Sequence, residues 1–217
     1  MKKIGVILSG CGVKDGSEIH EAVATLLAID RAGAQAVCMA PNIELDEVNH
    51  LTSEATGKKR NVLIESARIA RGNIKDIATV KASEMDAVIL PGGFGAAKNL
   101  SDFAMKGAES KGHPEVTRLI REMALAKKPI GAICIAPGTI AAILGREIHP
   151  TLTIGTDKGT ADVLEKLGAK HQSCPVKEFV VDEKNKIVST PAYMLATRIS
   201  EAAEGIEKLV KEVIRLA

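Results

Sequence analysis

A cysteine stands where a short apolar run meets the start of an expected helix, in the segment GAICIAP from Gly131 to Pro137. On such a strand-to-helix turn, the sulfur of Cys134 is expected to lie exposed at the edge of a sheet. Free N–H groups at the helix start favour the thiolate, as on the nucleophile elbow of hydrolases. The alternative is a buried cysteine that packs as a small hydrophobe. Gly131 and the immediate change from strand to helix favour the nucleophile.

Two consecutive glycines in the segment PGGFG, residues 91–95, follow another apolar run. Glycines at this place let backbone N–H groups turn toward a ligand, as an oxyanion hole requires. A tight turn with a positive φ angle would explain the same glycines without any chemistry. In combination with the cysteine, we expect the N–H groups of Gly93 and Ile135 to be oxyanion donors and Gly92 to line the pocket.

Two glutamates, Glu18 and Glu21, occupy the first turns of an expected helix. A carboxylate there usually complements the helix dipole or caps the helix, and Glu18 fits that role together with Asp15. Glu21 instead flanks the apolar positions of the helix, so its carboxyl group is expected to point over the edge of the sheet. Desolvation would raise the pKa of such a carboxyl group and suit it to general acid–base catalysis. Spacing alone leaves both roles of Glu21 open.

The loop GCGVKDG, residues 10–16, departs from both common nucleotide-binding patterns. It has an extra residue before its last glycine for a dinucleotide fingerprint, and it lacks the Gly-Lys-Ser/Thr ending of a Walker loop. We therefore favour no nucleotide cofactor there and expect Cys11 to line the pocket. Cys38 is expected in the core and Cys174 in a loop. The five histidines lack metal-ligand spacing, so no metal is predicted, and His149 is a candidate to reach the cysteine turn.

The elements that would position these residues alternate along the chain. Apolar runs typical of buried strands occur at residues 3–9, 34–40, 86–90, 129–133 and 152–154. Amphipathic stretches typical of helices occur at residues 17–32, 61–71, 113–127, 137–144, 160–167 and 194–216. A hairpin at residues 179–190 is expected to turn at 183–185.

This alternation predicts a single α/β domain, residues 1–217, with a mostly parallel, doubly wound sheet and an excursion at about 42–83. In such sheets, ligands bind beyond the carboxyl ends of the strands, near a switch in strand order. The segments 9–12 and 91–93 and Cys134 all follow expected strands. Their convergence at one edge is the main clue to function.

Composition excludes several classes of protein. Lysine and arginine total 29 against 27 acidic residues, and aromatic residues make up 2%, too few for the stacking of nucleic-acid bases. The apolar runs are far shorter than the roughly 18 residues of a membrane span. No cleavage site follows the opening MKK, so we expect a cytoplasmic protein without a targeting segment. The four widely spaced cysteines indicate neither a zinc site nor a disulfide framework.

Five segments carry a resemblance to a known family: MKKIGVILSGCGVKDGSEIHEAV, LPGGFGAAKNL, the cysteine turn, LTIGTD and STPAYMLA. Together they resemble the ElbB family of isoprenoid-biosynthesis-associated glyoxalases over essentially the whole chain. That family belongs to the class I glutamine amidotransferase-like superfamily, with PfpI-type peptidases and parkinsonism-associated deglycases. The resemblance implies a flavodoxin-like three-layer sandwich and a homodimer. It also implies a cytoplasmic enzyme that converts glyoxal to glycolate without glutathione, metal or cofactor.

Carried over residue by residue, the resemblance implies that Cys134 is the nucleophile and Glu21 the helix-start glutamate. It also implies Gly93 and Ile135 as the oxyanion donors. The departure is the superfamily's histidine, because its usual strand position reads TIGTD here, residues 153–157. A His-x-Glu triplet, which amidotransferases carry after the cysteine, occurs before it, at residues 113–115. These departures argue against amidotransfer and peptidase chemistry.

The predicted reaction begins when the Cys134 thiolate adds to one aldehyde of glyoxal and forms a hemithioacetal. Glu21 would then move a proton between the two carbons through an enediol, and the resulting thioester would hydrolyse to glycolate. Two alternatives from other classes stay open. One is a thiol redox sensor, or a regulatory small-molecule-binding protein, with little or no catalysis. The other is nucleotide or flavin binding at residues 10–16.

Overall fold

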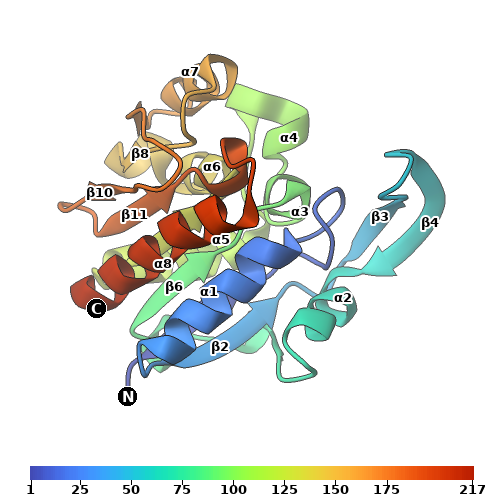
Figure 1. Cartoon of the computed structure of the whole chain (residues 1–217), viewed down its shortest axis with the longest axis horizontal. Coiled ribbons are helices and arrows are strands. Elements are labelled where there is room, and N and C mark those ends of the chain that lie inside the picture. Colours follow the sequence, from blue (N-terminus) through green and yellow to red (C-terminus); the bar gives the residue numbers. More distant parts are fainter.

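The computed structural model describes all 217 residues and has a seven-stranded central sheet (Figure 1). The strand order is β10-β11-β7-β6-β1-β2-β5, and every neighbouring pair is parallel except β10 and β11. The strands are β1 (Lys3–Ile7), β2 (Gln35–Ala40), β5 (Lys75–Asp76), β6 (Ala87–Leu90), β7 (Ile130–Ile133), β10 (Val180–Asp182) and β11 (Ile187–Thr190). The mostly parallel, doubly wound sheet expected from the sequence is confirmed.

Helices cover both faces of this sheet and complete the three-layer, flavodoxin-like sandwich. On one face, α1 (Ile19–Arg31) and α8 (Ile199–Leu216) lie side by side, with α2 (Val62–Ile69) next to α1 (Figure 1). The other face is covered by α5 (Pro114–Leu125), α6 (Ala136–Ile148) and α7 (Lys158–Lys166). None of the helices combines the length and apolar composition needed to cross a membrane.

Each face of the sheet has its own hydrophobic core. Val6 packs in the core under α1 and α8, whereas its neighbour Ile7 packs in the core under α5 and α6. Successive side chains of a strand point to opposite faces, so both must be apolar when both faces are covered. This explains why the strands appear in the sequence as unbroken apolar runs.

Strand register brings the candidate residues to one edge. Leu90 of β6 pairs with Ala132 of β7, and Ile133 pairs with Thr190 of β11. The three strands therefore finish level with one another, and the residues after them meet at the carboxyl edge of the sheet. The glycines after β6, Cys134 after β7 and the segment after β11 are neighbours for this reason.

The excursion at 42–83 departs from the α/β alternation. It contains β3 (Glu44–Val48) and β4 (Ala55–Asn61), an antiparallel hairpin that forms its own two-stranded sheet. The hairpin projects from the body of the molecule (Figure 1). The chain then runs through α2 and returns to the edge of the main sheet as β5.

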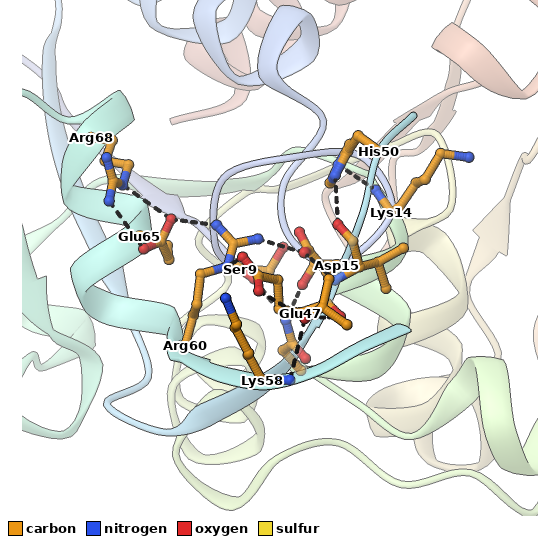
Figure 2. Close-up of polar contacts among 12 residues, drawn as sticks. Ser9, Lys14, Asp15, Glu47, His50, Lys58, Arg60, Glu65 and Arg68 are labelled. Atoms are coloured by element: carbon orange, nitrogen blue, oxygen red, sulfur yellow. Dashed lines mark hydrogen bonds and ion pairs between the residues drawn. The ribbon is translucent and has the colours of Figure 1, made fainter. Parts of the chain in front are cut away.

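A cluster of ion pairs around Asp15, Arg60 and Glu65, called the hairpin cluster below, joins this hairpin to the loop at residues 10–16 (Figure 2). Arg60 of β4 contacts Asp15 with its Nη2 at 2.5 Å and Glu65 of α2 with its Nη1 at 2.7 Å. Asp15 also accepts the N–H of Val48 at 2.9 Å. The expected cap pairing of Asp15 with Glu18 is therefore wrong: Glu18 caps α1 alone, accepting the Glu21 N–H at 2.7 Å, while Asp15 is held by the hairpin.

The other expected elements are present, with some ends shifted. Residues 179–190 form the antiparallel pair β10 and β11, as predicted. The last helix begins at Ile199 instead of 194, because residues 192–194 form a 3-10 turn after β11. The shorter elements are α3 (Phe94–Lys98), α4 (Phe103–Lys106), β8 (Thr151–Leu152), β9 (Lys170–His171) and the 3-10 turns Ile77–Thr79, Ala82–Glu84 and Gly107–Glu109.

Candidate active site

Cys134 occupies the strand-to-helix turn that the sequence predicts. Its φ angle is +61°, in the left-handed region that residues other than glycine rarely adopt, and α6 begins soon after it at Ala136. The Cys134 N–H donates to Thr190 O at 2.9 Å, which ties the turn to the end of β11. The side chain is not exposed as expected. Cys134 is only 7% accessible, because Glu21 and the glycines after β6 cover it.

Glu21 reaches the same place from the first turn of α1. Its Oε2 accepts the Gly92 N–H at 2.9 Å and its Oε1 accepts the Tyr193 N–H at 3.2 Å, which holds the carboxyl group beside Cys134. The residue is completely buried. The prediction that Glu21 points over the sheet edge therefore agrees with the structure, and the register of β6, β7 and β11 supplies its partners.

Burial controls the protonation of this pair. It raises the pKa of Glu21 from 4.5 to about 8, despite the opposing hydrogen bonds from Tyr193 and Gly92. The direction of this shift is the one that desolvation predicts for an acid–base group, a role that spacing alone had left open. Burial also raises the pKa of the Cys134 thiol well above its usual value, and the Glu21 charge raises it further. The expectation of a favoured thiolate is wrong, because desolvation outweighs the backbone donors.

Two backbone N–H groups point at the sulfur of Cys134. They belong to Gly93 and Ile135, and both hydrogen bonds lower the pKa of the thiol. Gly93 has a φ angle of +92°, and a Cβ added there would lie 2.4 Å from Glu18 N, so the position requires glycine. The two N–H groups can stabilise a negative charge on the sulfur or on an oxygen bonded beside it.

Gly92 separates Cys134 from Glu21. A Cβ added to Gly92 would lie 2.5 Å from the Cys134 Cβ and 2.6 Å from Glu21 Oε2. Contacts this short do not occur between real side chains, so any larger residue would push the nucleophile and the carboxyl group apart. The close approach, and not a positive φ angle, is the reason for glycine at this position.

A cavity of about 410 Å³ opens above the thiol. Its walls come from the loop before α1, from α3, from α7 and from the turn after β11. The lining residues are Val13, Glu18, Gly93, Phe94, Cys134, Ile135, Thr160, Tyr193 and Met194. Cys134 and Gly93 thus lie on the floor of a mostly apolar pocket that a small molecule can enter.

The sequence analysis missed Tyr193 and His20. The Tyr193 hydroxyl lies 2.8 Å from His20 Nδ1, and His20 Nδ1 lies 3.9 Å from Glu18 Oε1. Burial, together with the charges of Glu18 and Glu21, raises the pKa of Tyr193, so its hydroxyl keeps its proton. The available signal for Tyr193 was its position soon after β11, a strand that ends at the same edge of the sheet as β6 and β7. No spacing linked it to His20, which is exposed on α1.

Other candidate residues do not line the pocket. Gly92, which was expected to line it, lies between Cys134 and Glu21 instead. Cys11 is half-buried, does not line it, and is surrounded by the charged side chains of the hairpin cluster. Cys38 is buried in β2 as expected, whereas Cys174, expected as a loop thiol, is buried as well. His149 ends α6 at the far end from Cys134 and hydrogen-bonds Gly168 O at 2.8 Å. No three His, Cys, Asp or Glu side chains gather as they would around a metal ion.

Comparison with protein families assigns the fold and the site to one group. The model of the DJ-1/PfpI family matches residues 11–191, which include the glycines after β6, the cysteine turn and the end of β11. The chain belongs to the DJ-1/PfpI family.

Two curated mammalian relatives match almost the whole chain. The rat ES1 protein homolog, mitochondrial, is 45% identical over 99% of this chain and 84% of its own length. The human glutamine amidotransferase-like class 1 domain-containing protein 3, mitochondrial, is also 45% identical, over 99% of this chain and 83% of its own length. These names agree with the amidotransferase-like class expected from the resemblance.

Solved structures agree with the fold. The crystal structure of an isoprenoid biosynthesis protein with an amidotransferase-like domain from Ehrlichia chaffeensis superimposes with a TM-score of 0.93 at 38% identity, covering 100% of this chain and 99% of that one. Drosophila melanogaster DJ-1beta superimposes with a TM-score of 0.56 at 20% identity, covering 100% of this chain and 95% of that one. At 20% identity, the similarity to DJ-1beta shows the fold alone.

The comparisons overturn the expected cytoplasmic location. The rat and human relatives are named as mitochondrial proteins, and so is the zebrafish ES1 protein, which is 33% identical over 98% of this chain. The mitochondrial names of these relatives contradict the expectation of a cytoplasmic protein. Core packing and site geometry are the same in either compartment, so the residues that reveal the fold carry no information about location.

Proposed function

We propose that this protein is a glutathione-independent glyoxalase that converts glyoxal to glycolate on Cys134. The observation that carries the proposal is a completely buried carboxyl group, Glu21, that lies across Gly92 from the thiol of a strand-to-helix turn. The pKa of Glu21, raised to about 8, gives one group that can both donate and accept a proton near neutral pH. Membership in the DJ-1/PfpI family is consistent with an enzyme, and the specific reaction is our proposal.

In the first half of the reaction, the Cys134 sulfur adds to one aldehyde carbon of glyoxal. The carbonyl oxygen becomes an oxyanion that accepts hydrogen bonds from the N–H groups of Gly93 and Ile135. The neutral Glu21 carboxyl group donates its proton to this oxygen and becomes a carboxylate, while the thiol proton of Cys134 passes to solvent water. The product is a hemithioacetal, with the second aldehyde still intact.

In the second half, the Glu21 carboxylate removes the proton from the sulfur-bearing carbon. An enediolate forms, its hydroxyl proton moves between the neighbouring oxygens, and Glu21 returns a proton to the second carbon. The sulfur-bearing carbon is now a thioester, and water hydrolyses it to glycolate and free Cys134. One carbon is oxidised while its neighbour is reduced, so the reaction consumes only water and needs no external redox partner.

Glycolate formation from glyoxal tests this proposal directly. We expect turnover by the wild type and its loss, by at least about a thousandfold, in Cys134→Ala. Cys174→Ala is the matched control, because that thiol is also buried but lies outside the pocket. Absence of turnover by a folded wild-type protein would contradict the proposal.

A thiol redox sensor is the second candidate class. Oxidation by peroxide requires an accessible thiolate, whereas Cys134 is 7% accessible and has a raised pKa. Nucleophilic catalysis also needs the thiolate, so what favours the enzyme is the proton-transferring carboxyl group beside the thiol, which a sensor does not require. Selective oxidation of Cys134 by peroxide, without aldehyde turnover, would reverse this preference. The homodimer implied by the resemblance stays a prediction, which sedimentation velocity tests.

A further inference from the structure

The pocket above Cys134 is much larger than glyoxal. Its volume of about 410 Å³ lies within the range of roughly 300–1,000 Å³ that encloses a drug-sized ligand. Glyoxal consists of two joined aldehyde groups with no substituent, so it would fill only a small part of this space. The unfilled part lies beyond the reacting atoms, on the side lined by Phe94, Thr160 and Met194.

A second cavity, of about 360 Å³, adjoins the first. The two share three wall residues, Phe94, Ile135 and Thr160. The second cavity runs from this shared wall between α3 and α4 on one side and the start of α7 on the other. We call it the side groove; its remaining lining residues are Ala97, Phe103, Ala104, Gly107, Gly159 and Val163. Every residue unique to the side groove is apolar or glycine.

Charge limits what the combined space can bind. Among all lining residues of the pocket and the side groove, Glu18 alone carries a charge, and it is negative. Lys98 lies nearby with its Nζ 5.3 Å from the centroid of the Phe94 ring, but it lines neither cavity. A carboxylate or phosphate would therefore lose its hydration without meeting a cation, which is costly. The space suits an uncharged, apolar group.

We propose that the preferred substrates are α-oxoaldehydes, R–CO–CHO, in which R is an extended, uncharged apolar group. This proposal rests on the function proposed above and names its substrate class. The aldehyde end reacts with Cys134, and the group R lies along Phe94 and Ile135 into the side groove. The sulfur-bearing carbon is oxidised to the thioester, the ketone carbon is reduced to an alcohol, and water releases R–CHOH–COO⁻ and a proton.

Substrates that differ only in R test the proposal. We expect kcat/KM for phenylglyoxal, measured as mandelate formation, to exceed that for glyoxal by at least about tenfold. The matched control 4-carboxyphenylglyoxal has the same reactive end and an added anion. We expect its kcat/KM to be at least about tenfold below that of phenylglyoxal, because the anion meets no cation in the side groove. Equal values for the two aryl substrates would overturn the proposal.

A substitution in the side groove provides the second arm. Ala104 is exposed on α4 and lines the side groove but not the pocket. We expect Ala104→Trp to lower the ratio of phenylglyoxal to glyoxal turnover about tenfold. The same change at Ala126, exposed at the end of α5, is expected to leave the ratio unchanged. An unchanged ratio in Ala104→Trp, with glyoxal turnover present, would overturn the substrate class and leave the glyoxalase proposal standing.

A measurement without turnover separates the two proposals further. The rate of Cys134 alkylation is followed by peptide mass spectrometry with iodoacetamide and with 2-iodo-N-phenylacetamide. We expect the phenyl reagent to react faster, by about tenfold, and to lose this advantage in Ala104→Trp. No turnover of any aldehyde would reject the glyoxalase and this substrate class together. If the two reagents alkylate Cys134 at equal rates in a protein that turns over aldehydes, the binding of apolar groups in the side groove is rejected and the glyoxalase function is not.

Discussion

Two buried carboxyl groups lie near the carboxyl edge of the sheet, and their surroundings differ. Asp15 is 2% exposed and contacts the Arg60 guanidinium at 2.5 Å, with the Val48 N–H as a further donor. Glu21 is 0% exposed, and its partners are two backbone N–H groups and a thiol, with no cation among them. Figure 2 shows how closely the hairpin cluster surrounds Asp15.

The difference shows that burial alone does not mark a catalytic carboxylate. A carboxylate paired with a guanidinium is held charged and fixed in place, which suits it to join two segments of chain. A carboxyl group given only N–H donors and a thiol takes up a proton as its pKa rises. The kind of hydrogen-bonding partner, more than the degree of burial, distinguishes a structural carboxylate such as Asp15 from a carboxyl group such as Glu21 that can transfer protons.

The largest expected effect comes from removing the buried carboxyl group beside Cys134. We expect Glu21→Gln to lower glycolate formation by about 10²–10⁴-fold, because the amide keeps the shape but cannot transfer a proton. Iodoacetamide should still alkylate Cys134, which shows that the pocket is intact. Glu165→Gln, on the exposed face of α7, is the control and should keep wild-type turnover. Full turnover by Glu21→Gln would remove Glu21 from the mechanism.

The next effect concerns the stability of the hairpin cluster. Arg60→Met would leave Asp15 buried without its cation, and breaking a buried pair costs about 3–5 kcal/mol. Because the Arg60 side chain is 26% exposed, we expect a loss of about 3 kcal/mol in the free energy of unfolding, measured in urea. Lys59→Met breaks the neighbouring exposed pair with Asp46 and should cost much less, because solvent screens an exposed pair. Equal losses in both variants would contradict the structural role of Asp15.

The third effect is a dependence of stability on pH. The pKa of Glu21 is about 8 in the folded protein and 4.5 in the unfolded chain. At a pH between these two values, the folded state therefore holds a proton that the unfolded state has released. The protonated Glu21 adds to the free energy of unfolding at low pH. This contribution falls as the pH rises toward 8, by at most about 1.4 kcal/mol per pH unit.

Urea unfolding of the wild type and of Glu21→Gln between pH 5 and pH 8 isolates this contribution. The difference between the two free energies of unfolding should slope with pH across this range, because the other titrating groups are common to both proteins. Parallel curves would indicate that the pKa of Glu21 is not raised in the folded state.

The sequence was sufficient for the sheet and the cysteine turn, because both depend on local patterns. Unbroken apolar runs predicted the parallel strands, since both sheet faces are covered. The change from strand to helix at Gly131–Pro137 predicted the turn at Cys134. The 42–83 excursion was recognised only as irregular, since its hairpin is held by Arg60 and Asp15, residues far apart in the chain.

The protonation of the site could not be predicted in the same way. The low pKa expected for Cys134 came from the helix start alone, whereas the pKa in the folded protein depends on how deeply Glu21 and the glycines bury the sulfur. Tyr193 and His20 form their contact between the end of β11 and α1. Such pairings appear only when the strand order and register are known.

The close approach at Gly92 makes the reacting residues and the outer pocket wall differ in their capacity to evolve. Cys134, Glu21 and Gly92 are packed so tightly that no added side chain fits between them. The opposite wall, with Phe94, Thr160 and Met194, is free of this restriction. New substrate preferences can therefore arise by exchange of residues on that outer wall, while the inner wall preserves the reaction itself. One chemistry can in this way be retained through large changes in what it acts upon.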